Sequence, residues 1–101
     1  MIKDIRKRVA SGKYRFTVHA FERCAERNIS PKEVADVILS GEIIESYPTD
    51  KYGPSCLIFG MTKGERILHV QCSVDPIWVI TAYNPTLNPG KWDEHFKKRI
   101  K

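Results

Sequence analysis

The chain has 101 residues, of which 42% are hydrophobic and 29% are charged. This size and composition predict one globular domain over residues 1–101 and exclude a wholly disordered chain, because enough apolar side chains are present to form a core. No apolar run approaches the roughly 20 residues that cross a bilayer, and charges interrupt the N-terminal segment where a secretory signal needs an apolar stretch. We therefore expect a cytoplasmic protein without a membrane partner.

The net charge of +5 is concentrated in the first quarter of the chain. Residues 1–27 hold eight Lys and Arg against three Asp and Glu, whereas residues 28–101 hold nine of each kind. This asymmetry predicts an acidic partner, either a nucleic acid or an acidic protein.

Two helices are expected in the basic quarter. The first is amphipathic and ends at Gly12, with apolar residues at helical spacing. These residues are Ile2, Ile5 and Val9. Thr17 is expected to cap a second helix that runs to about Asn28, with Phe16 and Phe21 packed together as a hydrophobic staple.

A third helix has the best-defined ends. We expect Ser30 to cap it, Pro31 to take the first helical position and Glu33 to complete a capping box. Gly41 ends this helix, and the period of the apolar residues then changes from helical to strand-like.

The second half of the chain predicts an antiparallel sheet of about four strands and a short C-terminal helix. The candidate strands are residues 42–47, 55–61, 65–74 and 77–83. The links between the last three are too short for parallel crossovers, so these strands should form a meander. The closing helix is expected from residues at packing intervals, which are Trp92, Phe96, Arg99 and Ile100. Helices packed on such a sheet make an α+β domain.

One polar stripe on the second helix is a candidate for chemistry. His19, Arg23 and Arg27 stand at positions i, i+4 and i+8 and begin in the first helical turn. That location attracts phosphate and disfavours a protonated histidine, so a neutral imidazole above two arginines would suit proton abstraction beside a phosphate. The alternative is an exposed helix face that is partly paired through Glu22 and Glu26.

A second candidate cluster lies on the predicted sheet. His69 is on the side of its strand that faces away from the core residues, and Thr81 and Tyr83 of the next strand can lie beside it if the register permits. A second histidine with hydroxyl donors would suit a metal-independent phosphodiesterase. Alternatively, His69 and Tyr83 are half-buried strand residues whose polar ends are satisfied.

Other kinds of site have less support. The three histidines and three dispersed cysteines show no ligand spacing, so we expect no metal and no cofactor. The cysteines, Cys24, Cys56 and Cys72, also predict no disulfide framework, which fits a reducing cytoplasm. No glycine-rich phosphate loop or nucleophile elbow is present. The residues expected to bind RNA are basic, namely Lys3, Arg6, Lys7, Arg8 and Arg27.

The order of these motifs resembles the domain of unknown function 4258 (DUF4258) family. The resemblance covers about residues 14–99. It rests on Phe16-Thr17-x-His19-Ala20-x-x-Arg23-x-x-x-Arg27, Gly41-Glu42-Ile43-Ile44-Glu45-x-Tyr47-Pro48, Leu68-His69-Val70, Ile80-Thr81-Ala82-Tyr83-x-Pro85 and Trp92.

This resemblance implies an α+β domain with a curved antiparallel sheet. The family is thought to be related to the RelE-like toxin nucleases, small cytoplasmic proteins often encoded beside an antitoxin, so it also implies metal-independent RNA cleavage and an antitoxin partner. The family's active positions correspond here to His19, Arg23, His69, Thr81 and Tyr83. All five residue types are retained, whereas Cys24 and Asn28 stand where other residues are expected.

We therefore predict a toxin of a toxin-antitoxin pair, an endoribonuclease that forms a 2′,3′-cyclic phosphate. His19 would be the base, His69 with Tyr83 the acid, and Arg23 and Arg27 the phosphate-binding groups. The alternative is a non-catalytic module that holds a nucleic acid or an acidic protein on the same basic quarter. Only the enzyme requires His19 and His69 to converge on one surface.

Overall fold

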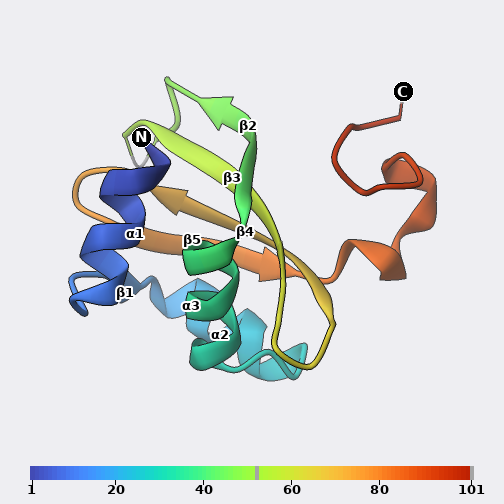
Figure 1. The fold of residues 1–101 in the computed structure, drawn as a ribbon, viewed down its shortest axis with the longest axis horizontal. Coiled ribbons are helices and arrows are strands. Elements are labelled where there is room, and N and C mark those ends of the chain that lie inside the picture. The colour runs from blue at the N-terminus through green and yellow to red at the C-terminus, as the bar shows by residue number, and fades with distance from the viewer. Residues whose placement is uncertain (52, 101) are drawn as a thin grey trace.

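The computed structural model describes residues 1–51 and 53–100. Within these residues the chain forms three α-helices, a five-stranded sheet and two short 3₁₀ turns (Figure 1). The elements are α1 (Ile2–Ala10), β1 (Arg15–Phe16), α2 (Val18–Glu26), α3 (Pro31–Ser40), β2 (Glu42–Tyr47), β3 (Ser55–Met61), β4 (Ile67–Ser73), β5 (Trp78–Tyr83), η1 (Pro85–Leu87) and η2 (Pro89–Lys91). The predicted α+β fold is confirmed.

The sheet has the strand order β1-β5-β4-β3-β2. Strands β2 to β5 form an antiparallel meander, which was expected from the short links for the last three of them. The two-residue strand β1 was not expected; it pairs parallel to β5, with Arg15 opposite Trp78 and Phe16 opposite Val79. A strand of two residues is too short to produce an alternating pattern in the sequence.

The helix ends follow the local sequence. The Thr17 hydroxyl accepts a hydrogen bond of 3.0 Å from the Ala20 amide at the start of α2. Ser30 and Glu33 form the expected capping box at the start of α3. The rings of Phe16 and Phe21 meet edge to face at a centroid distance of 6.5 Å, which confirms the predicted staple.

The helices cover one face of the sheet and bury an apolar core against it (Figure 1). The strands supply core side chains that alternate along β3 and β4, as the pleat requires, and that lie three residues apart on β5, where the register with β4 shifts. They include Cys56, Ile58, Leu68, Val70, Cys72, Val79 and Ala82. Helix α3 lies very close to β3, because a Cβ added at Gly60 would be 2.9 Å from the side chain of Val37. Glycine is thus needed at this crossing.

The predicted C-terminal helix is wrong. After η1 and η2, residues 92–100 form a loop that we call the C-terminal strap, closed by a β-bridge between Trp92 and Arg99. The Asp93 carboxylate accepts hydrogen bonds from the amides of His95 and Lys97 at 3.1 and 3.0 Å, so these amides do not enter a helix. The apolar residues have helical spacing, but the Asp93 carboxylate binds the backbone amides that a helix would use.

The described part of the chain includes no helix with both the length and the apolar character needed to span a bilayer.

Candidate active site

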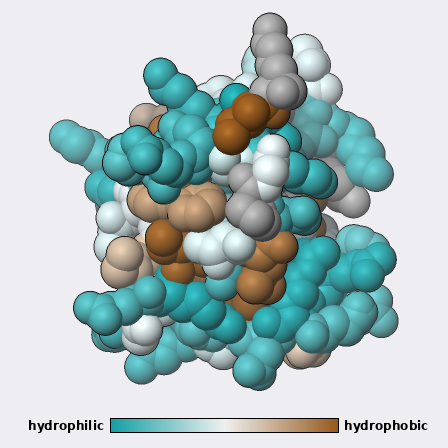
Figure 2. Space-filling view, turned by 90° about the vertical axis from the view of Figure 1, so that its right-hand side faces the viewer, coloured by the Kyte–Doolittle hydropathy of each residue, from teal (hydrophilic) through white to brown (hydrophobic). Residues whose placement is uncertain are grey.

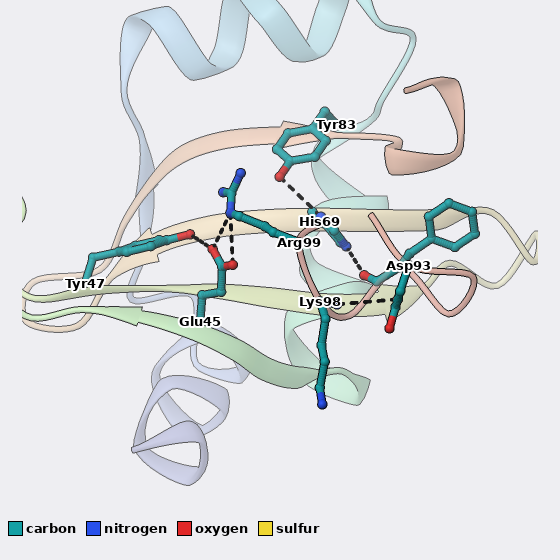
Figure 3. A network of polar contacts seen from close by, with 8 residues as sticks. Glu45, Tyr47, His69, Tyr83, Asp93, Lys98 and Arg99 are labelled. Atoms are coloured by element: carbon teal, nitrogen blue, oxygen red, sulfur yellow. Dashed lines mark hydrogen bonds and ion pairs between the residues drawn. The ribbon is translucent and has the colours of Figure 1, made fainter. Parts of the chain in front are cut away.

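The candidate site lies on the face of the sheet opposite the helices. In Figure 3 the labelled side chains project from the strands and the C-terminal strap on the near side, while α3 lies behind the sheet. The register places His69 of β4 opposite Tyr83 of β5, and Gln71 opposite Thr81. The expected cluster of His69, Thr81 and Tyr83 on one sheet face is therefore present.

His69 is completely buried on this face. Its Nε2 atom is 2.6 Å from the carbonyl oxygen of Phe96, and its Nδ1 atom is 3.2 Å from the hydroxyl of Tyr83. The ring of Trp92 covers it edge to face, with centroids 4.4 Å apart. The C-terminal strap thus seals His69 from solvent.

The hydrogen bonds of His69 define its tautomer. A carbonyl oxygen only accepts hydrogen bonds, so Nε2 carries the proton and donates to Phe96. Burial lowers the pKa of His69, against the opposing effects of the Phe96 carbonyl and the Glu45 charge, and so favours the neutral ring. In that neutral ring Nδ1 is an acceptor, and the Tyr83 hydroxyl donates to it.

Tyr83, which is bonded to His69, also lines a cleft of about 410 Å³. Burial raises the pKa of Tyr83, which keeps its hydroxyl protonated. Apolar side chains and four cations share the lining of the cleft. Its residues are Arg27, Ile29, Arg66, Tyr83, Asn84, Leu87, Asn88, Lys91, Trp92 and Arg99. Figure 2 looks at this C-terminal side of the molecule and shows hydrophobic groups surrounded by hydrophilic ones.

Three of the four cations are held in place by bonds within the protein. The Arg27 guanidinium donates to the carbonyl of Ala82 at 2.9 Å, which attaches the end of α2 to β5. Arg66 forms an ion pair of 2.8 Å with Glu33. The fourth cation, Lys91, is exposed. Fixed cations of this kind can bind a phosphate without first losing much side-chain freedom.

Arg99 is held by the most extensive contacts of the four. Its Nε atom donates to both carboxylate oxygens of Glu45, at 3.1 and 2.9 Å, and its guanidinium lies 4.7 Å from the centre of the Trp92 ring. The Tyr47 hydroxyl also donates to Glu45. Burial alone would raise the pKa of Glu45, but the bonds from Tyr47 and Arg99 outweigh it and lower that pKa. Burial and the bond to Glu45 raise the pKa of Tyr47 to about 12.

His19 and Arg23 are not part of this cleft. Both are exposed on α2, where the Arg23 Nε atom donates to His19 Nε2 at 3.4 Å and the guanidinium pairs with Glu26 at 3.5 Å. The expectation that His19 and His69 share one open surface is therefore wrong. The reason is that α2 packs on the core face of the sheet, whereas His69 projects from the opposite face, where the C-terminal strap covers it.

The residues predicted to bind RNA fall into three groups. Arg6 donates to the carbonyl of Gly41, and Arg8 donates to the Val74 carbonyl and the Asp75 carboxylate, each at 3.0 Å, so both arginines attach α1 to the rest of the fold. Lys3 and Lys7 are exposed on α1. Arg27 lines the cleft. Part of the basic quarter therefore holds α1 on the rest of the fold.

Sequence reasoning missed most of the cleft. Arg66, Lys91 and Arg99 come from the turn before β4, from η2 and from the C-terminal strap, with no common spacing. The only available signal was the basic run near the C-terminus, which includes Lys97 and Lys98. Among the described residues, no group of three or more His, Cys, Asp or Glu side chains is arranged to hold a metal.

A sequence model described as "Domain of unknown function (DUF4258)" matches residues 16–84. The chain belongs to the DUF4258 family. The match includes α2, α3 and the strands β2 to β5 but ends before η1 and the C-terminal strap. In this DUF4258 protein, Lys91, Trp92 and Arg99 therefore lie outside the matched segment, whereas His69 and Tyr83 lie inside it. No curated protein and no solved structure matches the chain.

Proposed function

We propose that this protein is a metal-independent endoribonuclease of the toxin type, which binds an RNA phosphodiester in the cleft beside Tyr83. One observation carries the proposal. The hydroxyl of Tyr83 is hydrogen-bonded to the buried His69, and Tyr83 also lines a cleft that contains four cations. A proton acceptor behind a phosphate-binding site is what cleavage by the RNA 2′-hydroxyl requires.

The proposed reaction uses Tyr83 and His69 as a proton relay. The RNA 2′-hydroxyl gives its proton to the Tyr83 oxygen while the Tyr83 proton moves to Nδ1 of His69. The 2′-oxygen bonds to phosphorus and the bond to the 5′-oxygen breaks. The leaving oxygen takes a proton from solvent, and the imidazolium later returns its proton through Tyr83. The products are a 2′,3′-cyclic phosphate and a 5′-hydroxyl.

The surroundings support each charge that develops. The carbonyl of Phe96 and the charge of Glu45 both favour a protonated His69 when the relay has acted. Arg27 and Arg99 lie where they can stabilise the negative charge on the phosphate oxygens. In this proposal His69, acting through Tyr83, replaces His19 as the base, because His19 does not line the cleft. His19, Arg23 and the exposed lysines of α1 would extend the contact with RNA.

The proposed enzyme acts on RNA in the cytoplasm, where its free cysteines stay reduced. As a toxin, the protein would be kept inactive by an antitoxin protein.

A second candidate function is non-catalytic RNA binding in the same cleft. It is favoured by the burial of His69, because both ring nitrogens already have partners within the protein. A satisfied buried histidine is often structural.

A cleavage and binding experiment separates the two functions. Purified wild type, Tyr83→Phe and Arg27→Ala would be incubated with a labelled single-stranded RNA in EDTA, with Tyr14→Phe as the matched control. We expect Tyr83→Phe to reduce the cleavage rate by about 100-fold or more, with little change in RNA affinity. Arg27→Ala should weaken binding, and Tyr14→Phe should change neither. Binding without EDTA-resistant cleavage would leave the binding module, and absence of both would refute both functions.

A further inference from the structure

The outer edge of β1 has no neighbouring strand among the residues that the structure describes. β1 is the first strand in the sheet order. The amides of Arg15 and Thr17 donate to the carbonyls of Ile77 and Val79, each at 3.1 Å, and so face β5. Because successive residues of a strand turn their backbone groups to opposite sides, the amide and carbonyl of Phe16 face away from β5. This is the arrangement that accepts an additional strand.

Apolar side chains surround this edge. The rings of Tyr14, Phe16 and Phe21 contact one another in series, with centroid distances of 6.3 and 6.5 Å. The last of them is 57% exposed, and Val18 beside it is 78% exposed. Exposed apolar groups that adjoin one another are typical of a protein-binding surface. The staple between Phe16 and Phe21 therefore fixes a surface as well as the start of α2.

A hollow of about 380 Å³ lies beside the same edge. It is lined by Gly12, Lys13, Tyr14, Arg15, Pro76, Ile77 and Trp78. Lys13 and Arg15 are exposed, and none of the described residues that line the hollow is acidic. The hollow is thus apolar and basic, and it lies at the start of β5, whereas the cleft adjoins its end at Tyr83.

We propose that this edge binds an acidic, extended segment of a partner protein, which adds as a strand beside β1. Tyr14 and Phe16 pack toward the helix side of the sheet, and Arg15, opposite Trp78, projects to the other side. An added strand would therefore place apolar side chains near Phe16 and Phe21, and acidic ones near Arg15. Alternation of aliphatic and acidic residues is the sequence that fits.

The charge at the edge favours this occupant over two others. A second copy of the chain would bring Lys13 and Arg15 of two molecules toward each other, which is unfavourable. A nucleic acid would satisfy the cations but would leave Phe21 and Val18 exposed to water. The inference does not depend on RNA cleavage in the cleft.

The test uses a short synthetic peptide of alternating Val and Glu with blocked ends. Amide chemical shifts would map its binding to isotope-labelled protein, and a peptide with Lys in place of Glu would be the control. We expect shifts at residues 13–18 and slower exchange of the Phe16 amide. Arg15→Glu should weaken binding by about 10-fold or more, and Phe21→Ser should weaken it as well. Both side chains are exposed, so both variants should fold. Met61→Ser, at the far end of β3 and 49% exposed, should bind normally.

Four results would overturn the proposal. The first is equal binding of the Lys peptide, and the second is the absence of binding up to the solubility limit of the Glu peptide. The third is dimerisation of the free protein that Phe21→Ser abolishes, which would assign the edge to a second copy. The fourth is displacement of the peptide by single-stranded RNA with shifts at the same amides, which would assign it to a nucleic acid.

Discussion

The two faces of the sheet are covered by different kinds of contact. On the helix side, apolar side chains such as Ile58 and Val37 pack into a continuous core. On the other side, a loop of irregular backbone is attached by hydrogen bonds and ion pairs to His69 and Glu45. Apolar packing is non-directional and determines whether the chain folds, whereas polar contacts position particular atoms. The second face is therefore the one on which a mutation can change chemistry without unfolding the protein.

The largest effect is expected on the helix face. Ile58→Ala removes a fully buried side chain between the sheet and α3, so the free energy of unfolding should fall by about 2–5 kcal/mol. Chemical denaturation monitored by circular dichroism would measure it. Met61→Ala, on the same strand but 49% exposed, is the control and should change little. Similar losses in the two variants would contradict the contrast between a packed and an exposed position.

Truncation on the other face should have a smaller and more local effect. Trp92→Ala removes the ring that covers His69, and the free energy of unfolding should fall by about 2 kcal/mol, because the C-terminal strap can relax around the lost volume. Hydrogen exchange should become faster at residues 92–100 and stay slow in α3 and β3. Uniformly faster exchange would show that the C-terminal strap and the helix core unfold as one unit.

The burial of His69 predicts a pH dependence of stability. Because its pKa is lowered in the folded state, the unfolded chain binds a proton first as the pH falls from about 6.5. The stabilising contribution is therefore complete above that value and is lost as the pH falls through the folded-state pKa. Urea unfolding between about pH 8 and pH 5 should show the loss in wild type and a flatter dependence in His69→Gln. Parallel curves for the two proteins would rule out this contribution.

The smallest effect is expected at the ion pair of Glu45 and Arg99. The arginine side chain is 54% exposed, so Glu45→Gln should cost less than about 1 kcal/mol of unfolding free energy. Its main consequence should be a more mobile Arg99, visible as line broadening or exchange of the guanidinium signals in NMR spectra. Glu22→Gln, on the exposed side of α2, is the control. An unchanged Arg99 signal would show that stacking on Trp92 alone is sufficient to hold it.

The parts of the fold that could be predicted depend on contacts between residues close in sequence. The hydroxyl caps of Thr17 and Ser30 satisfy amides within the next turn, so their residue types and spacing were enough. The alternation along β4 likewise placed His69 on the correct side of its strand. No local pattern could predict what covers that side.

The parts that failed depend on contacts between distant segments. Trp92 and Phe96 have helical spacing, yet the Asp93 carboxylate takes the amides that a helix would use, and Trp92 packs on His69 instead. Arg99 joins the other cations of the cleft only because the C-terminal strap folds over the sheet. The pairing of His69 with Tyr83 could be predicted because both strands belong to one hairpin. The separation of His19 from these two residues could not be predicted, because it depends on how α2 packs on the sheet.

The pairing of β1 with β5 has a consequence for how the protein is made. A ribosome releases β1 early, but the strand that β1 pairs with, β5, is the last strand of the meander to emerge. Contacts between such distant segments form slowly, because a long loop must close before they stabilise the chain. Until β1 docks, the edge of β5 in the newly formed sheet is therefore uncovered. A chain stalled after β5 but unable to dock β1 would expose this edge to other nascent chains, and aggregation would begin there.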